Sequence, residues 1–185
     1  RISREAVMAA EYNPNGGLTR TSFPGYQPGP CALHCASLQS RAAAMWACPH
    51  CRLALLASPE GASLACANGH AFDRAREGYV HLLPANRKRS PEPGDNPEMV
   101  AARRRVHDAG TYRRLADAVV AGLAGLPLRG GVLDLGCGEG YYTDVLARAL
   151  PGTALCGVDI SRTAVRLAAK RCAAAEFAVA SAYQL

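Results

Sequence analysis

The stretch VLDLGCGEGYYT, residues 132–143, decides the fold of the C-terminal part of this chain. Its first four residues are mostly apolar and predict a short strand, and an apolar helical pattern follows over residues 141–150. Between them lies a tight turn with glycines at positions 136, 138 and 140. A strand that passes through such a turn directly into a helix resembles the start of a cofactor-binding α/β unit.

The alternation of strand and helix continues along the chain. ALCGVDI (154–160) predicts a second strand, SRTAVRLAAKRC (161–172) a second helix with Ser161 as its N-cap, and EFAVA (176–180) a third strand. Three such repeats predict a parallel α/β sheet of the class I, Rossmann-like type. Because the chain stops at Leu185 while the sheet still has an open edge, we expect this domain, residues 99–185, to be C-terminally truncated.

Acidic residues surround the glycine turn. Asp134 and Glu139 flank it, and Asp159 ends the second predicted strand. Two carboxylates would repel a pyrophosphate, and Tyr141 takes the place of the third glycine of the dinucleotide fingerprint. S-adenosylmethionine has no phosphate and carries a sulfonium and an ammonium, so the acids favour it, with Asp159 placed to bind the ribose hydroxyls. The alternative is a turn that binds no nucleotide and has incidental acids.

A metal-ligand pattern precedes the sheet. CPHC (48–51) and CANGH (66–70) have the spacing C-x2-C-x14-C-x3-H, with Pro49 and Gly69 as turn residues. Two short-spaced pairs of this kind deliver the closed tetrahedron of sulfur and nitrogen donors typical of structural zinc. Unliganded or disulfide-bonded cysteines are the alternative. The pattern predicts a zinc finger over residues 45–72 with four ligands, namely Cys48, Cys51, Cys66 and His70.

The first 44 residues have no helical or alternating apolar pattern and contain the turn formers NPNGG and PGYQPGP. We therefore expect residues 1–44 to be a disordered or non-native extension, with the natural start near Met45. Cys31 and Cys35 lie in this part without a second pair of ligands, which favours free thiols.

The region between the two motifs is rich in prolines and charges. Residues 73–98 run through EGYVHLLP to RKRSPEPGDNPE and predict a basic linker. From Met99 to Leu126 apolar residues recur at helical spacing, interrupted at GTY (110–112), which predicts two helices with a break between them.

Charge and cysteine content restrict the class of protein. The formal net charge is +6, and residues 74–114 hold ten Lys and Arg against five Asp and Glu. Such a segment fits either an anionic partner such as RNA or a solvated helix face. Eight cysteines without a secretion signal favour the cytosol over a disulfide scaffold, and no apolar run is long enough to span a membrane.

Taken in order, these motifs make residues 45–185 resemble the N-terminal part of the RlmA family, the 23S ribosomal RNA guanine-N1 methyltransferases. The resemblance is carried by CPHC, CANGH, FDRAREGYVHLLP, RKRSPEPGDNPEMVAARRR, DAGTY and VLDLGCGEGYYT. It implies an N-terminal zinc finger that aids recognition of an RNA hairpin and a methyltransferase domain that binds S-adenosylmethionine. This sequence departs from the family at Val106 and His107, and at His81, which replaces a common Asn after EGYV.

The resemblance and the turn together predict the functional residues. Tyr112 of DAGTY is expected to pack on the cofactor, and its alternative role is interhelical packing. The expected cofactor-binding residues are Tyr112, Asp134, Gly136, Gly138, Glu139, Gly140 and Asp159. The candidate phosphate contacts to RNA are Arg87, Lys88, Arg89, Arg103, Arg104 and Arg105. No catalytic base is named, because in this fold it usually comes from later strands.

The expected protein is thus a cytoplasmic enzyme that methylates N1 of a guanine in 23S ribosomal RNA, with structural Zn²⁺ and a homodimer as a candidate assembly. Two rivals remain at this point. A small-molecule methyltransferase would share the glycine turn but has little use for a zinc finger. An inactive zinc module that only binds RNA would have no cofactor site at Gly138.

Overall fold

The computed structural model describes residues 45–88, 90–91, 93–128 and 130–184 of the 185-residue chain. The expectations for residues 1–44, including those for Cys31 and Cys35, lie outside the described residues. None of the described helices is long and apolar enough to cross a membrane.

The N-terminal part of the described chain is a small antiparallel sheet. Its four strands are hydrogen-bonded in chain order, so the chain runs as a simple meander. Within β3 the central Leu64 points into the core, while its neighbours on the strand are more exposed. The strands are β1 (Trp46–Ala47), β2 (Ala54–Ala57), β3 (Ser63–Ala65) and β4 (Ala71–Asp73).

A second, parallel sheet follows, and it confirms the strands predicted from the sequence. Its order is β5-β8-β7-β6, with every neighbouring pair parallel. The strands are β5 (Val80–His81), β6 (Val132–Leu135), β7 (Leu155–Asp159) and β8 (Glu176–Val179). Gly157 in the middle of β7 is required by packing, because a Cβ there would lie 2.6 Å from the Phe177 ring.

The strand β5 corrects the interpretation of residues 73–98 as a linker. Val80 and His81 pair with Ala178 and Val179, so the sheet has a fourth strand beyond the three predicted. Tyr79, Val80, Leu82 and Leu83 are buried. A strand of two residues is too short to show an alternating pattern in the sequence. It forms at the sheet edge because it pairs with β8.

Four α-helices complete the fold, and the two predicted before the glycine turn are both present. They are α1 (Pro97–Asp108), α2 (Arg113–Ala124), α3 (Tyr141–Ala149) and α4 (Arg162–Arg171). Two short 3₁₀ turns, η1 (Ala85–Arg87) and η2 (Ala182–Gln184), accompany them. Ser161 is the N-cap of α4 as expected, since its hydroxyl accepts a hydrogen bond from the Ala164 N–H.

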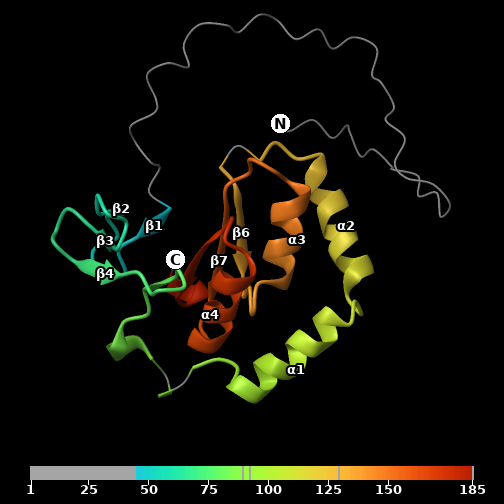
Figure 1. Ribbon diagram of the computed structural model, residues 1–185. Helices are drawn as coiled ribbons and strands as arrows, with labels where there is room; N and C mark the ends of the chain where they lie inside the picture. The colour runs from blue at the N-terminus through green and yellow to red at the C-terminus, as the bar shows by residue number, and fades with distance from the viewer. Residues whose placement is uncertain (1–44, 89, 92, 129, 185) are drawn as a thin grey trace, which may run out of the picture. The chain divides into compact units, whose positions relative to one another are not determined.

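The parallel sheet is covered on two faces by different parts of the chain. Along β8 and just beyond it, Phe177 and Val179 pack with residues of α4, whereas Ala178 and Ala180 pack with Trp46 and other residues of the antiparallel sheet. This alternation is the two-residue period of a strand buried on both faces. Figure 1 shows the result, with β1–β4 on one side of the parallel sheet and α3 with α2 on the other.

Candidate metal centre and cofactor turn

The four predicted zinc ligands lie together. One donor atom each from Cys48, Cys51, Cys66 and His70 falls within 4.8 Å of all the others. The Sγ atoms of Cys51 and Cys66 are 3.6 Å apart, and His70 Nδ1 lies 3.6 Å from Cys48 Sγ and 3.4 Å from Cys66 Sγ. Around a tetrahedral zinc ion the corresponding ligand-to-ligand distances are about 3.6–3.8 Å, given Zn–S and Zn–N bonds of about 2.3 and 2.0 Å.

The backbone folds tightly around these ligands in both knuckles. In the first knuckle the Arg52 N–H donates to the Cys48 carbonyl, and Arg52 itself adopts a φ of 63°. In the second the Gly69 N–H donates to the Cys66 carbonyl, and Gly69 has a φ of 80°, which explains the glycine. Burial acts to raise the pKa of Cys66, but hydrogen bonds with His70, Cys51 and Asn68 together outweigh it and lower the pKa to about 6. A readily formed thiolate is the state that binds metal.

His50, the other histidine of the first knuckle, lies outside the cluster. Its side chain is exposed, and its ring stacks on Phe72 with centroids 6.0 Å apart. The ring of His70 is 5.0 Å away, but His50 contributes no atom to the group of four donors.

The glycine turn after β6 has the backbone of a ligand cradle. Gly136, Gly138 and Gly140 have φ of 77°, 56° and 81°, which only glycine adopts readily. Gly140 also lets the turn approach α4, since a Cβ there would lie 2.9 Å from the Ala168 Cα. A Cβ at Gly136, by contrast, would meet nothing within 4 Å. The turn is therefore closed toward the helix at Gly140 and open at Gly136.

Two carboxylates stand at the carboxyl ends of neighbouring strands beside this turn. Asp134 accepts a hydrogen bond of 2.6 Å from the Thr143 hydroxyl. Burial raises the pKa of Asp134, and the negative charge of Asp159 raises it further, against that hydrogen bond. Asp159 accepts from the Gly138 N–H at 3.0 Å through one oxygen and from the Ser161 N–H at 2.8 Å through the other. The backbone thus fixes the orientation of the Asp159 carboxylate. Thr143 had no distinguishing signal in the sequence.

Glu139 lies where the sequence reasoning did not place its side chain. Its carboxylate is fully buried and lies 2.7 Å from His107 Nδ1 and 3.0–3.2 Å from the guanidinium of Arg171. Arg171 also pairs with Asp108. His107 in turn stacks on Tyr141 with ring centroids 4.4 Å apart. The side chain of Glu139 therefore joins α1 and α4 to the turn.

Tyr112 lies in the break between α1 and α2, at the N-cap position of α2. Its side chain is 42% exposed and meets the His107 ring edge-on, with centroids 5.5 Å apart. It is thus neither buried between the helices nor committed to a hydrogen bond among the described contacts, and part of its side chain remains exposed.

The predicted basic residues have different surroundings. Arg103 pairs with Asp95, and its guanidinium comes within 3.8 Å of a Cβ position on Gly138, so it lies over the glycine turn. Arg104 pairs with Asp108 within α1, whereas Arg105 and Lys88 are exposed. Arg89 and the side chain of Arg87 lie outside the described part of the chain.

Comparison with known proteins places both regions. Residues 46–91 match the family model of the RlmA N-terminal zinc ribbon, and residues 132–185 match a methyltransferase domain model. A 23S rRNA (guanine(748)-N(1))-methyltransferase from Streptomyces fradiae is 36% identical over 74% of this chain and 48% of the relative. A putative 23S rRNA (guanine-N(1)-)-methyltransferase from Micromonospora griseorubida is 35% identical over 58% of this chain and 41% of the relative.

The chain spans about half the length of these curated relatives. Among solved structures, the plantazolicin methyltransferase BpumL overlaps 48% of this chain and 37% of its own, with 22% identity and a TM-score of 0.37.

The fold and the two sites define a chain with a Cys₃His zinc-ribbon region followed by a methyltransferase domain with a parallel sheet. More particularly, residues 46–91 match the RlmA N-terminal zinc ribbon, and the two curated relatives carry the names of a 23S rRNA guanine-N1 methyltransferase and a putative one.

Proposed function

We propose that this protein transfers a methyl group from S-adenosylmethionine to N1 of a guanine in 23S ribosomal RNA. The observation that carries the proposal is the pair of carboxylates, Asp134 and Asp159, beside a glycine turn that is open at Gly136. The relatives' names support the choice of substrate. An enzyme that acts on ribosomal RNA is expected to work in the cytoplasm, and we include that location in the proposal.

A structural zinc ion fits the ribbon. The donors are three sulfurs and one imidazole nitrogen, spaced like the corners of a tetrahedron, and Cys48 and Cys66 are buried. Cys48, Cys51, Cys66 and His70 would hold the ion and leave no coordination position for a substrate. The role of zinc is therefore to hold the two knuckles together.

S-adenosylmethionine fits the turn by charge and by space. When bound, the cofactor supplies a methyl group already activated on a sulfonium. A carboxylate has about four acceptor positions, so Asp159 can hold its two backbone N–H groups and still accept from two ribose hydroxyls. Asp134 would add a second negative charge that favours a cationic ligand. The exposed face of Tyr112 is available to pack on the ligand.

Of the groups predicted to bind RNA, Lys88 and Arg105 are exposed and free of the ion pairs described here, so they are the better phosphate ligands. Arg103, over the glycine turn, is placed instead to orient groups near the cofactor. Recognition of a hairpin in the RNA belongs to the same proposal, because a splayed-out base can present its Watson–Crick edge. A homodimer stays an expectation that sedimentation would decide.

Calorimetric titration with S-adenosylmethionine tests the cofactor site. We expect Asp159→Asn to weaken binding about tenfold or more, because an amide cannot replace both carboxylate acceptors. Asp117→Asn is the matched control, since Asp117 is exposed and pairs only with Arg113 in the described contacts. Equal affinities in the two variants, or preferential binding of NAD or ATP, would reject the site.

Primer extension on 23S ribosomal RNA tests the reaction, because a methyl group on guanine N1 blocks base pairing. The expected result is a stop at one guanine that needs both the protein and S-adenosylmethionine. Equal methylation of small phenols or quinones would favour a small-molecule methyltransferase instead.

A further inference from the structure

A cavity of about 530 Å³ opens at the carboxyl end of the parallel sheet, beside the proposed cofactor residues but sharing none of them. His81 at the end of β5, Val179 at the end of β8 and Ile160 after β7 form its floor. The N-terminal turn of α4 forms one wall, and the other is lined by Lys88, Pro91, Pro93 and residues 95–97. The Ser161 hydroxyl donates to the Asp95 carbonyl at 2.8 Å and ties these walls together.

The charged residues that line this cavity are mostly cationic. Lys88, Arg162 and Arg166 come from two separate segments, and His81 lies between them. The one carboxylate among the described lining residues is Asp95, and Arg103 already neutralises it. Arg162 donates to the Tyr79 hydroxyl, which leaves its charge intact. The positive charge is therefore not balanced within the described part of the cavity.

The backbone adds further donors on the same wall. At the start of α4 the Ala164 N–H is capped by Ser161, while the Arg162 and Thr163 N–H groups have no partner among the described hydrogen bonds. Free N–H groups at the start of a ten-residue helix attract anions. Burial lowers the pKa of His81, and the charges of Lys88 and Arg162 lower it further, which reflects the positive potential inside the cavity.

We propose that this cavity binds a phosphodiester group of the substrate RNA through Lys88, His81, Arg162 and Arg166. The inference rests on the proposed function, because RNA is the anion that function brings to the protein. The volume of the cavity is in the range of pockets that hold a small ligand, about 300–1,000 Å³, so one nucleotide unit fits. The cavity and the acidic turn, joined through Asp159 and Ile160, would then hold the polyanionic substrate and the cationic methyl donor side by side.

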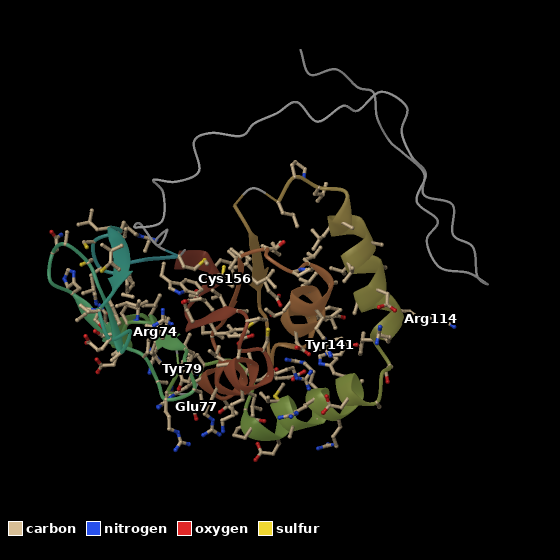
Figure 2. All side chains as sticks on the ribbon, turned by 45° about the horizontal axis from the view of Figure 1, so that its top comes forward. Arg74, Glu77, Tyr79, Arg114, Tyr141 and Cys156 are labelled. Atoms are coloured by element: carbon tan, nitrogen blue, oxygen red, sulfur yellow. The ribbon has the colours of Figure 1, made fainter. Side chains whose placement is uncertain are left out.

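Binding of a fluorescent RNA hairpin, measured by anisotropy in the full chain, tests the cavity. We expect Arg166→Glu to raise the Kd about tenfold or more at low salt and to reduce the slope of log K against log salt by about 1. Arg114→Glu is the matched control, because it makes the same charge change at an exposed arginine on α2 (labelled in Figure 2) that is not among the residues lining the cavity. Its Kd should change by less than about threefold.

Equal losses in the two variants would overturn the proposal, because they would mean that only net charge matters. An unchanged Kd in Arg166→Glu would overturn it as well. Circular dichroism and calorimetric binding of S-adenosylmethionine are run on the same samples. If Arg166→Glu binds the cofactor normally and loses RNA, the cavity is supported; if the wild-type chain binds no cofactor, the proposed function fails independently.

A second titration tests whether the cavity binds the phosphate of RNA or free inorganic phosphate. A mononucleotide-length RNA fragment should displace the hairpin, and inorganic phosphate should need a far higher concentration to do the same. NMR should show the pKa of His81 rising when the fragment binds. A rise of equal size with inorganic phosphate at the same concentration would overturn RNA as the occupant and leave a site for free phosphate.

Discussion

The buried side chain of Glu139 forms ion pairs that connect α1 and α4 to the glycine turn. We expect Glu139→Gln to lower the free energy of unfolding by about 3 kcal/mol, because Arg171, itself 13% exposed, loses its buried counter-charge. Urea denaturation followed by circular dichroism measures the change.

The control for that substitution lies on α3. Asp144→Asn removes one partner of the Arg148 ion pair, where the arginine side chain is 70% exposed, and should cost less than about 1 kcal/mol. Similar losses of unfolding free energy in both variants would mean that the buried cluster of Glu139, His107 and Arg171 stabilises the fold no more than an exposed ion pair does.

Single residues also show the limits of prediction from sequence. The four metal ligands follow from their spacing, because two short-spaced pairs of Cys and His are typical of a structural zinc site. The two aspartates follow from their places at strand ends. Glu139 belongs to a turn, where the direction of a side chain depends on local φ and ψ, and so its partners on α1 and α4 could not be foreseen.

Between elements, the approach of the glycine turn to α4 depends on Gly140. Gly140→Ala should lower the free energy of unfolding by more than about 2 kcal/mol for two reasons. The new Cβ would lie 2.9 Å from the Ala168 Cα, and alanine would have to adopt a φ of 81°. S-adenosylmethionine affinity should fall with it. Thermal and urea melts of the same variant measure the loss.

Gly122→Ala is the matched control, because Gly122 lies within α2 and a Cβ there meets nothing within 4 Å. It should stabilise the protein by about 0.5–1 kcal/mol through helix propensity. A neutral result for Gly140→Ala would show that the turn can move away from α4.

Regular elements were predictable where the apolar period was long enough to read. The α/β alternation after residue 132, the break between α1 and α2, and the Ser161 cap all followed from local pattern and are present. Strand β5 was not predictable, because two residues have no period and their pairing with β8 joins positions almost 100 residues apart. Long-range pairing of this kind is invisible to local sequence.

For the molecule as a whole, the metal centre and the parallel sheet share one apolar cluster. Cys48 and Cys66 belong to it together with Leu82, Val158 and Ala178. Trp46 anchors the contact by donating from Nε1 to Glu176, which also pairs with Arg74 (labelled in Figure 2). Zinc removal should therefore loosen the sheet as well as the ribbon.

Chelation tests this coupling with a built-in reporter, since Trp46 is the single tryptophan of the chain. We expect chelation to shift its emission to the red, to lower the urea midpoint, and to speed amide hydrogen exchange in β7 and β8. Adding zinc back should reverse all three. If chelation speeds amide exchange only in β1–β4 and leaves β7 and β8 unchanged, the shared core is contradicted.

The shared cluster has a consequence for protein engineering. A ribbon grafted from another protein would have to match Val158 and Ala178 in shape, and a sheet transplanted without its ribbon would present bare apolar side chains to water. Chimeras that exchange only one of the two should be insoluble, whereas chimeras that exchange both as a single unit, joined at the start of α1, should be recovered from expression intact.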